Sequence, residues 1–133
     1  MLSDGEGEVG TETVYDLASL TKPFVATTAL RLYQAGVFPF GAKVSDLVDE
    51  AAAHPVGARH WDEVLSHRSG LAAWEPFYER LPAAANVEEA EGQVLAQLLP
   101  SWSQRRVGIS VYSDLGYILA GIAMRRAAGA SLD

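Results

Sequence analysis

The chain has 133 residues and contains no cysteine. Disulfide bonds, thiolate metal ligands and a thiol nucleophile are therefore excluded, while the redox compartment stays undetermined. Basic residues are also scarce, because 10 lysines and arginines stand against 17 acidic residues and leave a formal net charge of −7. This negative charge argues against a nucleic acid partner and against electrostatic adsorption to an anionic membrane.

Long hydrophobic runs are missing as well. The most apolar stretch, residues 115–124, is about half the length that a helix needs to cross a bilayer. The first residues have no basic region followed by an apolar stretch, so the sequence predicts no signal peptide. The compartment is thus unknown, with the cytoplasm as the default and the periplasm as the alternative if the natural N-terminus lies upstream.

What the chain does contain is enough apolar material, 49% of its residues, for one globular domain. Residues 1–12 are rich in glycine and acid, and they predict a flexible segment that leads into a short strand near Val14–Tyr15. Apolar periodicity, caps and breakers predict helices over 19–35, 61–67 and 86–99 and from 113 or 114 to Gly129, with an irregular connection at 36–60. The first helix is apolar almost all round, which is typical of a helix in the interior.

Ser19 and Lys22 are the most informative residues. They stand three positions apart at the predicted start of the first helix, so their side chains share one face. A serine hydroxyl needs a base to become a nucleophile, and a lysine that loses its proton through burial and the helix dipole can be that base. The spacing thus favours acyl transfer through a serine ester. The alternative is a capping serine beside a lysine that extends to solvent.

A second candidate motif, Tyr112-Ser113-Asp114, precedes the last helix. A tyrosine at a corner between a strand and a helix can take part in proton transfer if a nearby cation lowers its pKa. The alternative is a packed aromatic ring followed by an ordinary N-cap.

Three stretches, residues 14–23, 65–71 and 111–121, together resemble the serine beta-lactamase and penicillin-binding-protein superfamily. The branch they resemble is that of the class C-like serine hydrolases, which include DD-peptidases and esterases. The resemblance implies an α+β, beta-lactamase/transpeptidase-like fold, of which this chain forms mainly the helical lobe with few short strands. It also implies a beta-lactam, a D-Ala-D-Ala peptide or an ester as substrate.

The resemblance implies a role for each motif residue. Ser19 would be the acylated nucleophile, Lys22 its proton acceptor and Tyr112 the second acid/base. Asp114 would bind substrate at a position that usually carries asparagine, and its carboxylate would favour the charged form of Lys22. Neither a metal nor another cofactor is implied.

The family's third catalytic element, a K-[ST]-G or H-x-G strand, does not occur in this sequence. Residues 1–133 are therefore expected to form a single partial domain of a longer architecture. Two alternatives stay open: a non-catalytic fragment or pseudoenzyme, and an unrelated helical interaction module. Apolar surface left exposed on a partial domain would favour self-association.

The histidines and tryptophans receive plainer interpretations. His54, His60 and His67 have no metal-ligand spacing and are expected at the surface or at helix ends. The three tryptophans are expected to be packing residues.

Overall fold

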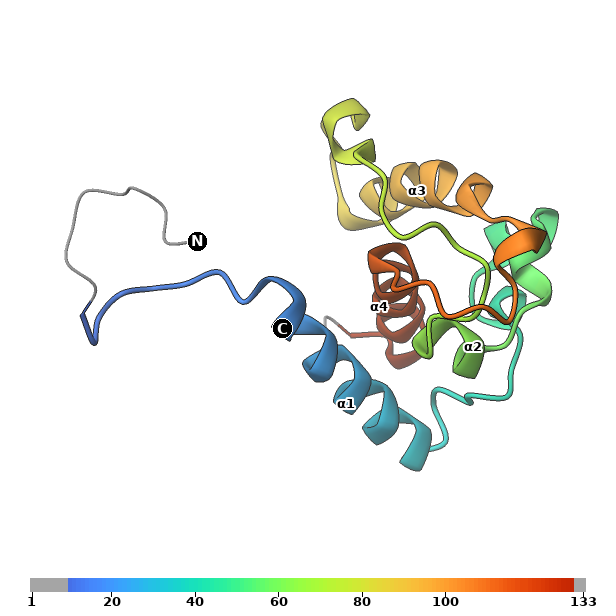
Figure 1. Cartoon of the computed structure of the whole chain (residues 1–133), viewed down its shortest axis with the longest axis horizontal. Coiled ribbons are helices and arrows are strands. Elements are labelled where there is room, and N and C mark those ends of the chain that lie inside the picture. The colour runs from blue at the N-terminus through green and yellow to red at the C-terminus, as the bar shows by residue number, and fades with distance from the viewer. Residues whose placement is uncertain (1–9, 131–133) are drawn as a thin grey trace.

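The computed structural model describes residues 10–130, so most of the predicted flexible segment 1–12 lies outside the described residues. Four α-helices and seven short 3₁₀ turns make up the described chain (Figure 1). The helices are α1 (Thr21–Gln34), α2 (Trp61–Leu65), α3 (Val87–Leu98) and α4 (Asp114–Ala128). The 3₁₀ turns are η1 (Ala18–Leu20), η2 (Val44–Asp46), η3 (Asp49–Ala53), η4 (Pro55–Ala58), η5 (Phe77–Arg80), η6 (Leu99–Ser101) and η7 (Gln104–Arg106).

The central element is α4, which contacts each of the other three helices. The Ser113 hydroxyl caps it by accepting a hydrogen bond of 3.1 Å from the Gly116 N–H, and Gly129 ends it with a φ of 61°. Its predicted apolar stripe is buried except for Ile118, which is 40% exposed. The buried side chains of α4 that pack in the core are Leu115, Leu119, Ala120, Ile122, Ala123 and Met124.

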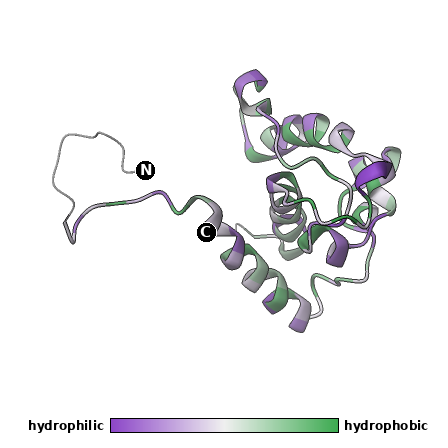
Figure 2. Ribbon diagram, in the orientation of Figure 1, coloured by the Kyte–Doolittle hydropathy of each residue, from purple (hydrophilic) through white to green (hydrophobic). Residues whose placement is uncertain are grey.

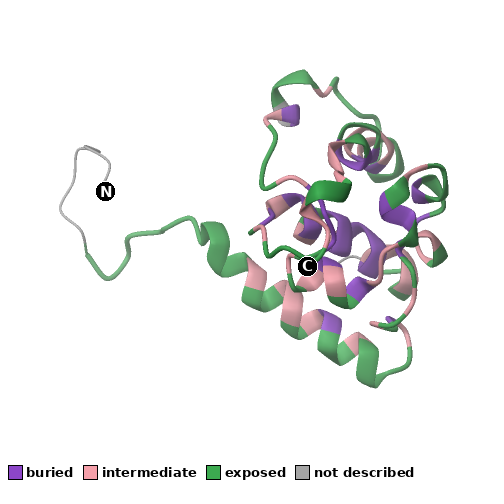
Figure 3. Ribbon diagram, turned by 45° about the vertical axis from the view of Figure 1, so that its right-hand side comes forward, coloured by how far each residue is buried: buried purple, intermediate pink, exposed green. Residues whose placement is uncertain are grey.

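The prediction that the first helix lies in the interior is wrong. Only Ala29 of α1 is buried, whereas Phe24 is 64% exposed and Tyr33 51% exposed. Hydrophobic residues occur in both α1 and α4 (Figure 2), but the buried segments concentrate in α4 and α1 is mostly exposed or intermediate (Figure 3). An apolar surface all round favours burial only where neighbours cover every side, and α4 covers α1 on one side.

The predicted strand near Val14–Tyr15 is also wrong, because these residues are unassigned and Val14 is 93% exposed. Among residues 10–130 there is no strand, and a single isolated antiparallel β-bridge pairs Lys43 with His60. Strands need a partner ladder as well as apolar residues. The helical lobe is therefore present, while the α+β class of the complete fold stays a prediction.

The remaining helices follow the predicted caps and breakers closely. Asn86 accepts a hydrogen bond of 2.8 Å from the Glu89 N–H at the start of α3, while the Glu89 carboxylate binds the Ala85 N–H rather than the N–H of the cap. Helix α3 ends at Leu98, close to the predicted end at 99, and Pro100 follows within η6. None of the helices in the described part is long and apolar enough to cross a membrane.

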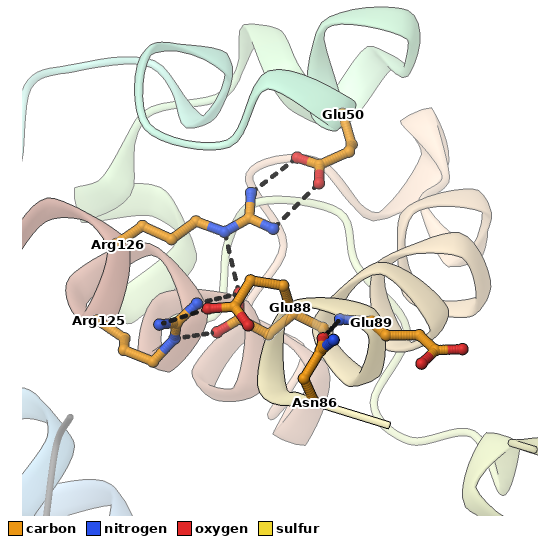
Figure 4. Close-up of polar contacts among 7 residues, drawn as sticks. Glu50, Asn86, Glu88, Glu89, Arg125 and Arg126 are labelled. Atoms are coloured by element: carbon orange, nitrogen blue, oxygen red, sulfur yellow. Dashed lines mark hydrogen bonds and ion pairs between the residues drawn. The ribbon is translucent and has the colours of Figure 1, made fainter. Parts of the chain in front are cut away.

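A cluster of ion pairs holds α3, α4 and η3 together (Figure 4). Glu91, which is buried, accepts hydrogen bonds from both Arg125 and Arg126, and Arg126 also binds Glu50 with distances of 2.8 and 3.0 Å. The two arginines lie in the last turn of α4, where the helix dipole favours positive charge.

Two of the three tryptophans pack as expected. Trp61 is fully buried, and Trp102 is partly buried with its indole N–H donating to the Ser69 carbonyl at 2.7 Å. Trp74 is 54% exposed, so the prediction that it is a packing residue is wrong.

Candidate active site

The first part of the site is the backbone that leads into α1. Ser19 lies in η1 and Lys22 in the first turn of α1, and the Lys22 ammonium donates a hydrogen bond of 3.3 Å to the Ser19 hydroxyl oxygen. Ala18, directly before the serine, has a φ of 45° and lies in the left-handed region that non-glycine residues avoid. The Ala18 N–H donates to the Asp16 carboxylate at 2.8 Å, which stabilises this bend. The structure therefore brings Ser19 and Lys22 together, as the spacing predicts.

The second part comes from the start of α4. Asp114 forms a hydrogen-bonded ion pair with Lys22, and this contact joins α4 to α1. The Lys22 side chain is only 13% exposed, whereas the carboxylate side of the pair is 42% exposed. The Asp114 N–H is in turn held by the Ala73 carbonyl at 2.8 Å, so the carboxylate stands on a fixed backbone.

The surroundings of Lys22 act on its pKa in opposite directions. Desolvation is the largest single influence and lowers the Lys22 pKa, but the hydrogen bonds and charges of Asp114 and Tyr112 outweigh it together and raise the pKa above its ordinary value. These contacts favour the ammonium form of Lys22. The Asp114 carboxylate acts on Lys22 in the direction that the sequence predicts, and it outweighs the burial together with Tyr112.

Tyr112 shows the opposite shift. Its phenol pKa is lowered, first by the hydrogen bond with the Ser19 hydroxyl and then by the Lys22 ammonium. The Lys22 Nζ lies 4.6 Å from the centre of the Tyr112 ring. The phenol thus stands in the same pocket as Ser19 with its anionic form stabilised, although Tyr112 is 55% exposed. The predicted corner between a strand and a helix is here an extended segment that runs into α4.

Two further aromatic residues, His67 and Tyr117, belong to the site and were not predicted as part of it. The His67 ring lies between the Tyr112 and Tyr117 rings, with centroid distances of 4.8 and 5.2 Å. The Tyr117 hydroxyl donates to the Leu65 carbonyl at 3.1 Å. Both residues stand inside the stretches that carry the family resemblance, but nothing in their spacing alone indicates that segments 45 or more residues apart meet here.

A cleft opens beside these groups. One pocket of about 480 Å³ is lined by Ser19, Lys22, Asp114 and Tyr117 together with apolar side chains of α1 and α4. A neighbouring pocket of about 430 Å³ shares Ser19, Lys22 and Tyr117 and adds the His67 and Tyr112 rings. The serine therefore lies on the boundary of two cavities, where an acyl donor can reach its hydroxyl while the phenol and ammonium remain in contact with it.

The arrangement brings a hydroxyl, a phenol of lowered pKa and a charge-compensated ammonium into one cleft, and these are groups that acyl transfer through a serine ester can use. A family model described as beta-lactamase matches residues 3–133. The chain belongs to the beta-lactamase family.

The relatives and structural neighbours agree with this family. The chain is 26% identical over 125 residues to penicillin-binding protein 4* of Bacillus subtilis and 30% identical over 131 residues to an N-acetylmuramyl-L-alanine amidase of the same organism. These alignments cover 91% and 92% of this chain. Among solved structures, a mutant class C beta-lactamase matches with a TM-score of 0.68 at 26% identity, and a beta-lactamase from Sulfitobacter sp. EE-36 matches with 0.61 at 27%.

The chain spans only a part of each of these proteins. It covers 27% and 30% of the two relatives, and each structural match covers 85% of this chain and 29% of the other. The shared part includes the segments that carry Ser19, Lys22 and Tyr112, because the matched family region runs almost from end to end of the chain.

Proposed function

We propose that the protein is a serine hydrolase that forms an acyl-enzyme on Ser19. The observation that carries this proposal is the hydrogen bond from the Lys22 ammonium to the Ser19 oxygen, in a pocket that the Tyr112 ring also lines, 4.6 Å from the Lys22 Nζ. A hydroxyl that is held by a cation, with a phenol of lowered pKa in the same pocket, is prepared for nucleophilic attack.

The proton path follows from the two pKa shifts. We assign the proton transfer from Ser19 to Tyr112, because a lowered pKa makes its anionic form more accessible, whereas Lys22 has a raised pKa and stays charged. The role of Lys22 is then to stabilise the phenolate and to orient the hydroxyl oxygen. Tyr112, expected as the second acid/base, thus also takes the part of the proton acceptor that was expected of Lys22.

Acylation of Ser19 takes two steps and is followed by hydrolysis. The Ser19 oxygen attacks the substrate carbonyl carbon, its proton moves to Tyr112, and the carbonyl π electrons move onto the carbonyl oxygen. The tetrahedral intermediate then collapses, the C–N bond of an amide or lactam or the C–O bond of an ester breaks, and the leaving group takes the proton from the Tyr112 phenol. Water reverses the sequence and releases the acid, with Tyr112 acting again as base and then as acid.

The substrate class is a carbonyl compound that acylates the serine of the enzyme: a beta-lactam, a D-Ala-D-Ala peptide or an ester. The family membership and the names of the two relatives support this range, since one is a penicillin-binding protein and the other an amidase. The apolar wall of the larger pocket, which includes Val25 and Ile118, suits an apolar acyl group.

The test is the mass of the intact protein after incubation with a reactive penicillin and, separately, with a fluorophosphonate. We expect one adduct per chain in the wild type and in Ser45→Ala, a control that removes a hydroxyl from η2, and no adduct in Ser19→Ala. Absence of an adduct from the wild type with both probes would refute the proposal and favour the non-catalytic alternative. An adduct that persists in Ser19→Ala would refute Ser19 as the nucleophile.

A further inference from the structure

His67 makes two independent contacts with the candidate site. Its Nδ1 accepts a hydrogen bond of 3.0 Å from the Ser113 N–H, the residue that caps α4. Its ring packs between those of Tyr112 and Tyr117, which lie on either side of the cap in the sequence. One side chain on the segment after α2 therefore touches the backbone that begins α4 and the phenol ring that lies next to Ser19.

The backbone at His67 supports the same arrangement. The His67 carbonyl accepts a hydrogen bond of 2.9 Å from the Val111 N–H, one residue before Tyr112. His67 has a φ of 62°, and among the described residues only it and Ala18 are non-glycine residues with positive φ. Both flank the candidate site, one beside the nucleophile and one beside the phenol. Left-handed conformations of non-glycine residues persist where surrounding contacts over-determine them, and they cluster at functional sites.

We propose that His67 is a positioning residue that holds the Tyr112 phenol and the N-terminus of α4 in place against Ser19 and Lys22. This inference rests on the proposed function for its consequence in catalysis, but its contacts can be tested without any substrate. The ring contact fixes the phenol, and the Nδ1 contact fixes the backbone from which Asp114 reaches Lys22.

The charge state of His67 suits this role. Nδ1 must be unprotonated to accept from the Ser113 N–H, so the neutral ring carries its proton on Nε2. The His67 pKa is lowered, first by desolvation and then by the Lys22 ammonium, while Asp114 opposes the shift. These two charges and the flanking Tyr112 and Tyr117 rings are the titratable groups that face it from α1, from α4 and from the segment before α4. At neutral pH the acceptor is therefore available.

Two substitutions separate the two contacts. His67→Asn removes the ring but keeps an acceptor, because the amide oxygen is attached to the same γ carbon as Nδ1, and asparagine tolerates the left-handed conformation. His67→Phe keeps a ring but removes the acceptor. His54→Asn and His54→Phe repeat both changes at the junction of η3 and η4 and are the matched controls.

Two readouts follow these contacts in the full chain. The Tyr112 pKa comes from the ¹³Cζ signal of labelled tyrosine, assigned by its disappearance in Tyr112→Phe, and the Ser113 N–H is followed by hydrogen exchange. We expect His67→Asn to raise the Tyr112 pKa and to leave the exchange of Ser113 unchanged. We expect His67→Phe to leave the Tyr112 pKa lowered and to speed the exchange of Ser113 by about tenfold, which corresponds to losing one hydrogen bond.

The outcomes that overturn the proposal are equally distinct. A Tyr112 pKa that is the same in wild type and His67→Asn refutes the positioning of the phenol, and equal changes of both readouts in both variants show a merely structural role. If the proposal holds, His67→Asn also slows acylation by about tenfold or more, since a small displacement of a proton acceptor has effects of this size. A wild type that forms no adduct refutes the proposed function, while the titration and exchange data still decide on His67.

Discussion

Helices α1 and α4 have similar lengths and are both at least half apolar, yet they are buried very differently. In α4 seven of 15 residues are buried, whereas in α1 one of 14 is. The candidate site lies between them, with Ser19 in η1 just before the exposed helix, Lys22 in its first turn, and Tyr112 and Asp114 where the buried helix begins. Half of the chemistry therefore stands on the core, and the other half stands on a mostly exposed segment that packs against α4 on one side.

The contacts of α4 on its two sides differ in kind. Toward α3 it makes a network in which Glu91 binds two arginines, and toward α1 it makes the ion pair of Asp114 with Lys22 (Figure 4 shows the first). Glu91 has a side chain only 9% exposed, while Asp114 is 42% exposed and lines a pocket. The buried network is suited to stability, and the open pair is suited to chemistry at the surface of a cleft.

The largest effect on activity is expected at Tyr112. Tyr112→Phe keeps the ring and removes the proton acceptor, so we expect the rate of acylation by a reactive penicillin to fall by about a hundredfold or more. Tyr33→Phe, at an exposed tyrosine of α1 that stacks on Phe40, is the control and should leave the rate unchanged. An equal rate in Tyr112→Phe and wild type would exclude the phenol as the base.

The difference in burial predicts a difference in stability between matched leucines. Leu119→Ala in α4 removes a fully buried side chain and should lower the free energy of unfolding by about 2–5 kcal/mol. Leu30→Ala in α1 truncates a side chain that is 47% exposed and should lower it by less than about 1 kcal/mol. Urea denaturation of both variants measures this. Equal losses would show that α1 is buried in solution, for example by self-association.

The sequence predicts the helices and the meeting of Ser19 with Lys22, because both follow from local spacing, caps and breakers. Ser113 and Asn86 cap their helices as expected, and Gly129 ends α4. The sequence does not predict which of the two apolar helices is buried, since burial depends on neighbouring elements rather than on the helix itself. For the same reason it places neither His67 beside Tyr112 nor Trp74 at the surface, because both positions depend on contacts between distant segments.

The protonation of Lys22 also depends on a contact between distant segments. Burial and the helix dipole lower the lysine pKa, and a carboxylate at position 114 opposes them. The structure brings that carboxylate into a hydrogen bond, and together with the phenol it outweighs the desolvation. The sign of the balance depends on distances that no motif specifies.

The ion-pair network predicts a smaller effect on stability. Glu91→Gln removes a buried charge from between two arginines and should lower the free energy of unfolding by about 1–3 kcal/mol. Glu88→Gln changes a 75% exposed residue of the same helix, 3.7 Å from Arg125, and should change it by less than about 0.5 kcal/mol.

The contribution of Glu91 to stability depends on pH. The Glu91 pKa is lowered in the folded protein, mainly by its hydrogen bond with Arg125, so its contribution is fully present above the ordinary value of 4.5 and is lost as the pH falls through the folded pKa. The difference in stability between wild type and Glu91→Gln should therefore shrink below pH 4.5. A difference in the free energy of unfolding that stays constant as the pH falls through the folded pKa of Glu91 would contradict this account.

The smallest expected change is a shift of the pH profile. Asp114→Asn removes a charge that raises the pKa values of both Lys22 and Tyr112, so the acid limb of the acylation profile should move to lower pH. Asp49→Asn, at the start of η3, is the control and should leave the profile in place. A shift to higher pH in Asp114→Asn would contradict the proposed charges of the site.

The proposed chemistry depends on the phenol pKa of Tyr112, which the Ser19 hydroxyl and then the charged Lys22 lower. The most direct measurement is the titration of the Tyr112 ¹³Cζ signal in wild type and in Lys22→Met, which keeps a long side chain without the charge. We predict a phenol pKa below the ordinary value of 10.0 in the wild type and a rise of that pKa in Lys22→Met. An identical phenol pKa in the two proteins would contradict the account.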